Sequence, residues 1–264
     1  MLKYKKLNLC LDRVNMKKIQ VYLPCYNESP NIIPLTEKWF ALENDFRKIG
    51  YELHVCCIDD KSTDDTAEKI KSLTVRFPNC ELVQHEHNKG LGGVLNTAFG
   101  LFLDTCAQGD LCVLMDGDNS HEPIYSLSML SKIDAGADVV IASRYQAGAD
   151  VKGLSGDRKV MSNGAGVFYK VVLNVKNVRD YTCGYRMYTY SILEKARETY
   201  GPDIAERRTF ACMMEVLYKL AKIGAKFDEV PFVLRYDHKQ GDSKMSVFKT
   251  AKDSVLTAFS LRFG

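Results

Sequence analysis

Short apolar runs rich in β-branched residues alternate with longer segments of helical periodicity through the first half of the chain. The runs cover residues 19–23, 53–58, 80–85, 111–115 and 137–143. Between them, apolar residues at helical spacing are clearest over 63–77 and 91–106. Such alternation predicts right-handed crossovers and a mostly parallel sheet with helices on both faces, which is an α/β fold.

The pattern becomes less regular after about residue 145. The stretch "AGADVKGLSGDRK" is rich in glycine and polar residues and predicts a loop. Beyond it, the apolar pattern predicts helices near 159–174, 190–199 and 206–223. A strand is predicted to follow them at 229–236. The second half is therefore expected to be more helical than the first.

A chain of 264 residues can bury one large core, so we expect a single domain. That domain is predicted to span residues 18–264, with a first half at 18–145 that contains the regular alternation and a second half at 146–264. Residues 1–17 are interpreted as a leader that precedes the first strand.

Composition excludes some classes of function. The formal net charge is only +3 and no basic stretch is interleaved with aromatic residues, which argues against a nucleic-acid partner. The nine cysteines contain no C-x-x-C pair and lie mostly in apolar runs, as expected for buried thiols in a reducing compartment. No apolar run approaches the roughly 18–20 residues of a membrane span, so we expect a cytoplasmic protein.

Polar clusters follow three of the predicted strands. They read "PCYNE" after the first strand, "DDKSTDD" after the second and "DGDNSH" after the fourth. Because parallel strands end at the same edge of a sheet, the three clusters are expected to meet there. That edge is where ligands bind in open α/β sheets, so the clusters predict one site.

Asp116 and Asp118 end the fourth strand with only Gly117 between them. At about 4 Å two such charges repel by roughly 4 kcal/mol at an effective dielectric near 20, so a cation is expected beside them. Carboxylates and phosphate oxygens together suit Mg²⁺ or Mn²⁺, which predicts a metal and diphosphate site. The alternative is a turn in which Asp118 or Asn119 caps the helix that follows.

Two further segments are ambiguous on their own. Asp59 and Asp60 end the second strand, where a carboxylate could accept from a base N–H or a ribose hydroxyl, or could serve in helix capping. The glycines in "HNKGLGG" could allow a nucleotide to approach the backbone closely, although their spacing is that of neither a dinucleotide fingerprint nor a P-loop.

Seven segments carry a resemblance to a known family. They read "LPCYNE" (23–28), "IDDKSTDDT" (58–66), "NKGLG" (88–92), "MDGDNSHEP" (115–123), "ASRY" (142–145), "DYTCGYR" (180–186) and "EVPFVLRYDHKQGDSKM" (229–245). In this order and spacing they resemble the motifs of family 2 glycosyltransferases with a GT-A fold. The most similar subgroup is that of the polyprenyl-phosphate mannosyl- and glucosyltransferases.

The resemblance implies an inverting transfer of a hexose from a nucleotide-diphosphate sugar, of the GDP-mannose or UDP-glucose type, to a polyprenyl phosphate. It implies that Mg²⁺ or Mn²⁺ is held by Asp116, Asp118 and Ser120. The nucleotide-sugar-binding residues that it implies are Pro24, Tyr26, Glu28, Asp60, Gly90, Gly92, Asp116, Gly117, Asp118, Ser243 and Lys244.

Arg144 and Arg158 are implied as guanidinium clamps for phosphate, since a planar fork suits bidentate binding. Asp180 is the candidate general base if the acceptor is a hydroxyl; equally, it could be a structural carboxylate that bonds the "TCGYR" turn. Where the family motif has an arginine, this chain has His238 followed by Lys239, and no phosphate contact is assigned there.

The C-terminal segment predicts an amphipathic helix. Its stripe consists of Val247, Phe248, Ala251, Val255, Leu256 and Phe259. The stripe could dock on a membrane surface, or it could pack on its own domain while a membrane-anchored subunit brings the lipid. Two other functions stay open, namely a GT-A glycosyltransferase for a saccharide or other soluble hydroxyl acceptor and a non-catalytic nucleotide-sugar-binding module.

Overall fold

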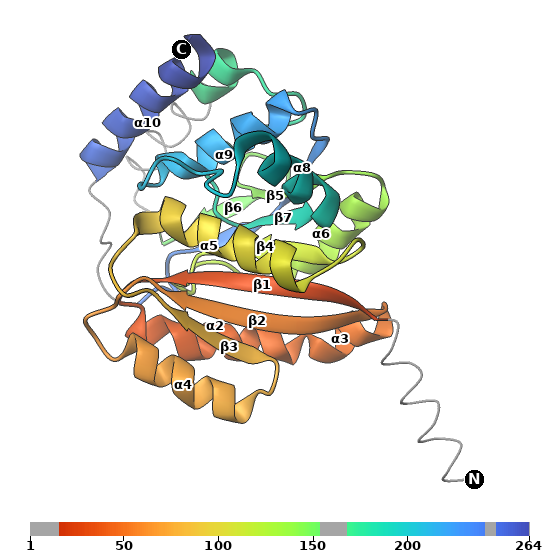
Figure 1. The fold of residues 1–264 in the computed structure, drawn as a ribbon, viewed down its shortest axis with the longest axis vertical. Helices are drawn as coiled ribbons and strands as arrows, with labels where there is room; N and C mark the ends of the chain where they lie inside the picture. The colour runs from red at the N-terminus through yellow and green to blue at the C-terminus, as the bar shows by residue number, and fades with distance from the viewer. Residues whose placement is uncertain (1–15, 154–167, 241–246, 264) are drawn as a thin grey trace.

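A seven-stranded, mostly parallel sheet forms the centre of the molecule (Figure 1). The computed structural model describes residues 16–153, 168–240 and 247–263. The sheet has the order β3-β2-β1-β4-β7-β5-β8. Its strands are β1 (Lys17–Cys25), β2 (Tyr51–Asp59), β3 (Cys80–Gln84), β4 (Leu111–Leu114), β5 (Val139–Ser143), β7 (Arg186–Thr189) and β8 (Phe227–Pro231). The predicted α/β class is confirmed.

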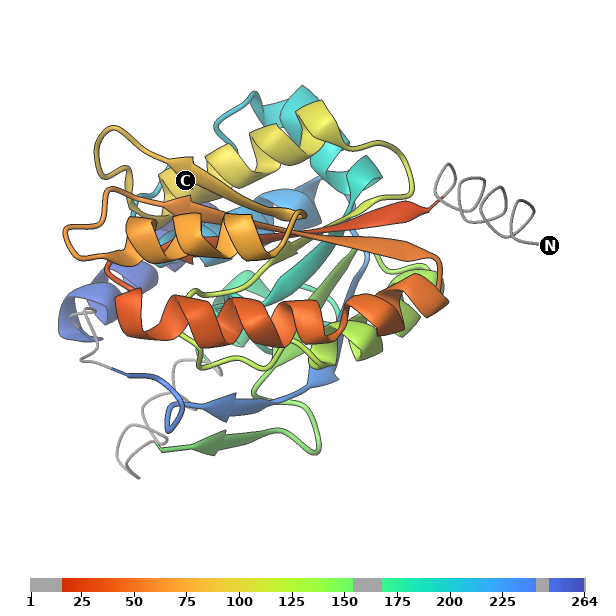
Figure 2. The same cartoon turned by 90° about the horizontal axis from the view of Figure 1, so that it is seen from below.

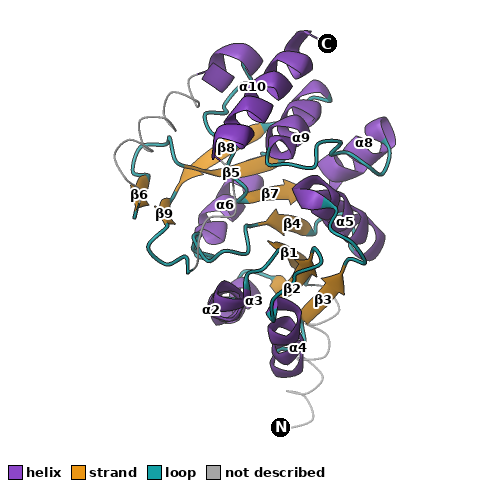
Figure 3. Ribbon diagram, turned by 90° about the vertical axis from the view of Figure 1, so that its left-hand side faces the viewer, coloured by secondary structure: helices purple, strands orange, loops and turns teal. Residues whose placement is uncertain are grey.

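Helices cover both faces of this sheet, as Figure 3 shows. On one face lie α2 (Ser29–Ala41), α3 (Glu43–Lys48), α4 (Thr66–Arg76) and α6 (Tyr125–Asp134). On the other lie α5 (Gly90–Thr105), α8 (Tyr190–Tyr200) and α9 (Ala211–Lys222), and α10 (Val247–Phe263) packs on α9. None of the helices in the described ranges is both long and apolar enough to cross a membrane.

The strand β7 is the feature that the apolar pattern did not reveal. It runs antiparallel between β4 and β5, and pairs Leu114 with Arg186. The predicted strand 229–236 is in fact two strands, since β8 ends at Pro231 and β9 (Val233–Arg235) leaves the sheet to pair with β6 (Asp150–Lys152). Figure 2 shows this small second sheet below the main one.

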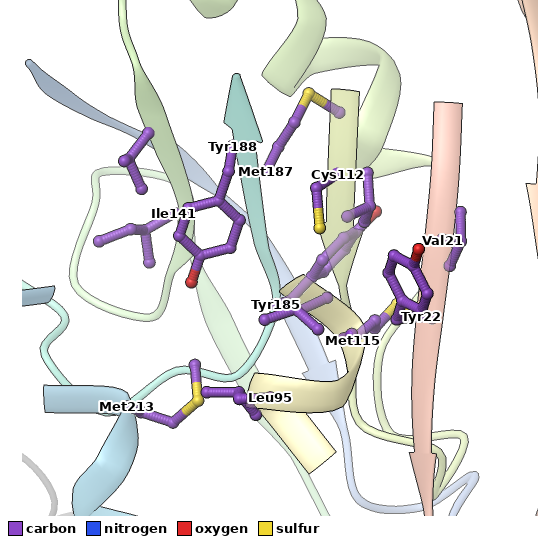
Figure 4. Packing of buried hydrophobic residues seen from close by; sticks show 14 of the residues in the cluster. Val21, Tyr22, Leu95, Cys112, Met115, Ile141, Tyr185, Met187, Tyr188 and Met213 are labelled. Carbon is purple, nitrogen blue, oxygen red and sulfur yellow. The ribbon is translucent and has the colours of Figure 1, made fainter. Parts of the chain in front are cut away.

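The core lies between the strands and the helices on each face. Figure 4 shows Tyr22, Cys112 and Tyr188 on β1, β4 and β7, packed near Leu95 of α5 and Met213 of α9. All four residues of β4 are buried, because a central strand covered on both faces must be apolar throughout. Of the eight cysteines in the described ranges, all are free thiols and seven are buried, as predicted.

Two predicted boundaries need comment. The helix predicted over 206–223 begins only at Ala211, because the carboxylate of Glu215 accepts the backbone N–H groups of Glu206 and Arg207 and holds that segment as a loop. Of the helix predicted at 159–174, residues 168–173 are helical and 159–167 lie outside the described residues, as do residues 1–15 of the predicted leader.

A fully buried arginine joins β7 to α9. The Arg186 guanidinium donates to the carbonyl oxygens of Tyr181 (2.8 Å), Cys183 (2.9 Å) and Met213 (2.6 Å). Replacing it with Met leaves three buried carbonyls without a donor. We expect Arg186→Met to lower the free energy of unfolding by about 3 kcal/mol or more in urea denaturation.

Arg197→Met is the matched control, because Arg197 is partly exposed and pairs on the surface with Asp104. We expect it to change the free energy of unfolding by less than about 1 kcal/mol. Equal effects of the two substitutions would contradict a structural role for Arg186.

Candidate functional site

The carboxyl ends of β1, β2 and β4 meet at one edge of the sheet, and the start of β7 reaches the same edge because that strand is antiparallel. The loops at 26–28, 60–64, 116–120 and 180–185 are thereby brought together. Three of these were predicted to share an edge; β7 adds the fourth. This edge is called the rim below.

Asp116 sits at the tip of β4 in very tight surroundings. A Cβ on Gly117 would lie 2.6 Å from the carbonyl oxygen of Pro24, so only glycine allows this loop to pack on β1. A Cβ on Gly184 would collide with the Asp116 carboxylate. The two glycines therefore fix where the Asp116 carboxylate lies, and Gly184 was not among the predicted site residues.

Asp118 faces a cation and a local hydroxyl. Its Oδ1 accepts from Ser120 N (3.1 Å) and Oγ (2.5 Å), and its Oδ2 accepts from Lys239 Nζ at 2.8 Å. The N-cap of α6 is Ile124, with no side-chain cap hydrogen bond. The alternative that Asp118 or Asn119 caps this helix is therefore wrong, and the role of Ser120 at a metal stays a prediction.

The two carboxylates differ in acidity. Burial, followed by the neighbouring charge of Asp118, raises the pKa of Asp116 to about 7. Burial also disfavours ionised Asp118, but His121 and Lys239 outweigh it and hold the pKa of that carboxyl below its ordinary value. Among the described residues, none forms an ion pair with Asp116. Below about pH 7 the rim therefore holds a protonated Asp116 beside an Asp118 carboxylate that Lys239 neutralises.

Arg144 and Asp180 form a closed pair. Arg144 donates from Nε to Oδ2 (2.8 Å) and from Nη2 to Oδ1 (2.6 Å), and also donates to Thr182 Oγ1. Asp180 is fully buried and accepts the backbone N–H groups of Thr182 and Cys183 as well. Burial raises the pKa of Asp180, but the guanidinium outweighs that effect and keeps it below its ordinary value.

This geometry is that of the alternative interpretation, in which Asp180 bonds the turn that contains it. Glu229 supports the pair from behind, because its Oε1 accepts the backbone N–H groups of Arg179 (2.7 Å) and Asp180 (2.8 Å). Its Oε2 accepts from Gln146. The sequence analysis missed this role of Glu229, although its place in the "EVP" segment was a usable signal.

Asp60 holds a loop in place. Its Oδ1 lies 2.7 Å from His85 Nδ1 and accepts Lys89 N, and its Oδ2 accepts Gly90 N at 2.9 Å. His85 Nε2 in turn lies 3.0 Å from Thr97 Oγ1. The carboxylate therefore fixes the start of α5 against the end of β2.

The close approach at Gly90 and Gly92 is made by the chain itself. A Cβ on Gly90 would lie 2.5 Å from the carbonyl oxygen of Arg208, and one on Gly92 would collide with that of Arg207. Arg208 also donates to the carbonyl oxygen of Asn88. The missing side chains thus make room for residues 207–208, a reason that spacing alone could not supply.

The remaining predicted residues fall into two groups. Pro24 is the penultimate residue of β1, Tyr26 follows the strand and is 41% exposed, and Glu28 precedes α2 and accepts from Asn31 Nδ2 at 2.8 Å. These three lie at the rim as expected. Outside the described residues are Arg158, Ser243 and Lys244.

The rim suits a hard divalent cation. Asp116 and Asp118 offer carboxylate oxygens, and the ammonium on Asp118 shows that this position accepts a cation. In the described ranges no group of three His, Cys, Asp or Glu side chains gathers as a metal cluster. The protein would therefore supply two carboxylates, and phosphate oxygens and water would complete the shell.

Residues 20–197 match the protein family described as Glycosyl transferase family 2. The chain belongs to this family.

Three curated relatives of this family 2 protein are similar over most of its length. Dolichol-phosphate mannosyltransferase from Pyrococcus furiosus is 30% identical over 86% of this chain, which spans 59% of that protein. Polyprenol monophosphomannose synthase from Mycolicibacterium smegmatis is 30% identical over 86% of this chain and 80% of its own length. Undecaprenyl-phosphate mannosyltransferase from Micrococcus luteus is 27% identical over 87% of this chain and 88% of its own length.

Solved structures support the fold of this family 2 chain. Glucosyl-3-phosphoglycerate synthase from Mycobacterium tuberculosis, in complex with Mn²⁺ and UDP-glucose, has a TM-score of 0.64 at 13% identity, with 96% of this chain and 81% of that chain covered. Mannosyl-3-phosphoglycerate synthase from Rubrobacter xylanophilus has a TM-score of 0.62 at 15% identity, with 94% of this chain and 74% of that chain covered.

The raised pKa of Asp116 predicts a pH-dependent stability. The folded state retains a proton up to about pH 7 that the unfolded chain releases near its ordinary value of 3.8. The free energy of unfolding therefore falls as the pH rises through that window. We therefore measure the free energy of unfolding by urea denaturation in the presence of a chelator. As the pH rises from about 5 to about 8, we expect the wild type to lose about 2 kcal/mol of this free energy relative to Asp116→Asn.

Asp45→Asn is the control, because Asp45 is a surface residue that pairs with Lys48. We expect it to follow the wild-type profile. A wild-type stability that rises over this range relative to Asp116→Asn would contradict the burial of an ionisable Asp116.

Proposed function

We propose that this chain is an inverting glycosyltransferase that transfers a hexose from a nucleotide-diphosphate sugar to a polyprenyl phosphate. The observation that carries the proposal is the pair of rim carboxyl groups: Asp118 already holds the Lys239 ammonium, and the buried Asp116 beside it has no ion-pair partner among the described residues. The three curated relatives support the acceptor class, and their names favour mannose as the sugar.

A divalent cation is part of the proposal. Asp116 and Asp118 would hold it, with Ser120 beside them, and the Mn²⁺ and UDP-glucose of the solved glucosyl-3-phosphoglycerate synthase agree with such a site. When bound, the cation supplies positive charge to the leaving diphosphate. Pro24, Tyr26 and Glu28 would contact the nucleotide, and Asp60 would position the loop beside it through Lys89 and Gly90. Gly90, Gly92 and Gly117 would keep the nearby backbone in place.

The state of Asp180 bears on the acceptor. A hydroxyl acceptor needs a general base, but the oxygens of Asp180 are already occupied by Arg144, Thr182 and Cys183. A phosphate monoester, with a second pKa of about 6, is anionic at neutral pH and needs no base. The geometry therefore favours a phosphate acceptor over the soluble hydroxyl acceptor.

Asp180 then has a positioning role. By fixing the Nε and Nη2 edge of Arg144, it holds the guanidinium in one orientation at the rim, where positive charge attracts a phosphate. The acceptor oxygen attacks the anomeric carbon as the nucleoside diphosphate leaves from the opposite face, so the configuration at that carbon inverts. Arg158, Ser243 and Lys244 are proposed as further phosphate contacts.

The exposed side of α10 supports a peripheral membrane location. Ser254, Thr257 and Ala258 are buried and Leu261 packs against the core, whereas four large apolar side chains of the helix are exposed. These four residues, Val255, Leu256, Phe259 and Phe263, are called the apolar face. The ring of Phe259 lies 5.7 Å from that of Phe168.

Of the predicted stripe, Val255, Leu256 and Phe259 lie in the described part of the chain, and each is partly exposed. The side chains of Val247, Phe248 and Ala251 lie outside the described residues. We propose that the apolar face docks on the membrane that contains the lipid acceptor, since a patch of large apolar side chains marks a contact surface. A membrane-anchored partner subunit stays a prediction.

The function is tested by product extraction. The protein is incubated with labelled GDP-mannose or UDP-glucose, Mn²⁺ and a polyprenyl phosphate, and counts are measured in the organic phase. We expect transfer by the wild type and a loss of roughly 100-fold or more in Asp118→Asn, because a charge that stabilises the leaving group is removed.

Asp45→Asn, a surface variant, should transfer at the wild-type rate. Label that enters only soluble acceptors would support the alternative glycosyltransferase, and nucleotide binding without transfer or hydrolysis would support a non-catalytic module. Full activity in Asp118→Asn would contradict the proposed site.

The apolar face is tested by vesicle binding. We expect Leu256→Glu combined with Phe259→Glu to reduce co-sedimentation with anionic vesicles at least tenfold, because each large apolar side chain contributes about 1.5–3 kcal/mol when buried. Transfer to a short-chain polyprenyl phosphate in detergent should be retained. Ser260→Glu adds a charge at an exposed polar position of the same helix and is the control.

A further inference from the structure

Lys239 is the residue in contact with the proposed metal site that no part of the proposed function uses. Its ammonium lies 2.8 Å from Asp118 Oδ2, and the two side chains are only 18% and 16% exposed. The ammonium therefore occupies an oxygen that a divalent cation would need. The ammonium and a divalent cation therefore compete for that oxygen, because their like charges repel at such a distance.

The backbone around Lys239 is fixed on both sides. On one side, His238 Nδ1 lies 2.9 Å from Glu122 Oε1. On the other, Gln240 N donates to Asn31 Oδ1 (2.9 Å) and Gln240 O accepts from Asn31 Nδ2 (3.0 Å). These contacts hold the backbone of Lys239 beside the rim.

A second backbone contact ties the same segment directly to the rim loop. Arg235 N donates to Ser120 O at 2.8 Å, so the strand that leads to Lys239 is bonded to the loop that carries Asp118. When a cation takes its place on Asp118, the lysine can respond only by turning its flexible side chain. The negative charge that arrives with the cation is the diphosphate of the donor.

We propose that Lys239 is an exchanging counter-ion: it neutralises Asp118 when the site is metal-free, and it moves to the donor diphosphate when cation and nucleotide bind together. This inference rests on the proposed function. The exchange makes binding of the metal and binding of the nucleotide cooperative. The cation must displace the ammonium from Asp118, and the diphosphate offsets that cost by pairing with the displaced ammonium. By linkage, each ligand then strengthens binding of the other by the same factor.

No other lysine in the described ranges contacts either rim carboxylate. Lys38, the nearest in the same cluster, bonds Glu122 Oε1 (2.9 Å) and Asn119 Oδ1 (3.0 Å) instead. The exchange is therefore assigned to Lys239 alone, and a single substitution tests it.

The test is isothermal titration calorimetry with Mn²⁺ alone, and then with GDP and UDP at saturating Mn²⁺. We expect Lys239→Met to bind Mn²⁺ alone about tenfold more tightly and the preferred nucleotide about tenfold more weakly than the wild type. Lys239→Arg should keep the wild-type pattern, because it keeps the charge. Lys48→Met removes an exposed lysine on α3 and should match the wild type.

Thermal unfolding checks that each variant is folded, and Lys239→Gln provides a second neutral side chain should Lys239→Met not fold. Unchanged affinities in the neutral variants would overturn the exchange, even if the wild type transfers sugar. Tighter Mn²⁺ binding without weaker nucleotide binding would also overturn it, because Lys239 would then only compete with metal. Tighter Mn²⁺ binding together with weaker nucleotide binding in the neutral variants would support the exchange. If the wild type then transferred no sugar, the proposed function would be contradicted while the exchange stood.

Discussion

The insertion of one antiparallel strand into a parallel sheet is the constraint on which the rest of the site depends. Because β7 runs against β4 and β5, its first residues reach the edge where the parallel strands end. Gly184 is thereby placed against the Asp116 carboxylate, and Asp180 is placed beside Arg144. The buried guanidinium of Arg186 then ties this segment to α9. Remove β7 from the sheet, and the two halves of the site are no longer adjacent.

Charge at the rim is arranged in separate pairs rather than as one cluster. Arg144 is matched by Asp180, Lys38 by Glu122, and Lys239 by Asp118. Asp116 lies among them without such a partner in the described ranges, and burial keeps its pKa high. A site of this kind can accept a cation with little rearrangement of its backbone, since only side chains need to move.

The motifs of the sequence predicted which residues lie at the site better than they predicted the contacts that those residues make. The positions of Asp116, Asp118 and Ser120 at the tip of β4 follow from where an apolar run ends, and they were predicted correctly. What Asp60 and Asp180 contact could not be predicted, because His85, Gly90 and Glu229 reach them from other parts of the chain. For the same reason Gly90 and Gly92 were assigned to a nucleotide, although it is the carbonyls of residues 207–208 that approach them most closely.

By itself, the sequence determined the α/β class, the approximate places of the first five strands along the chain and the polar clusters that follow them. Those features depend on the spacing of apolar residues a few positions apart and on the shared direction of parallel strands. Both can be read from short segments of the chain. Only the tertiary structure decided the place of β7, the outward turn of the apolar face on α10, and the contact of Lys239 with Asp118. Each of these joins residues that are distant in sequence, and no local pattern records which distant partner a strand edge, a helix face or an ammonium will find.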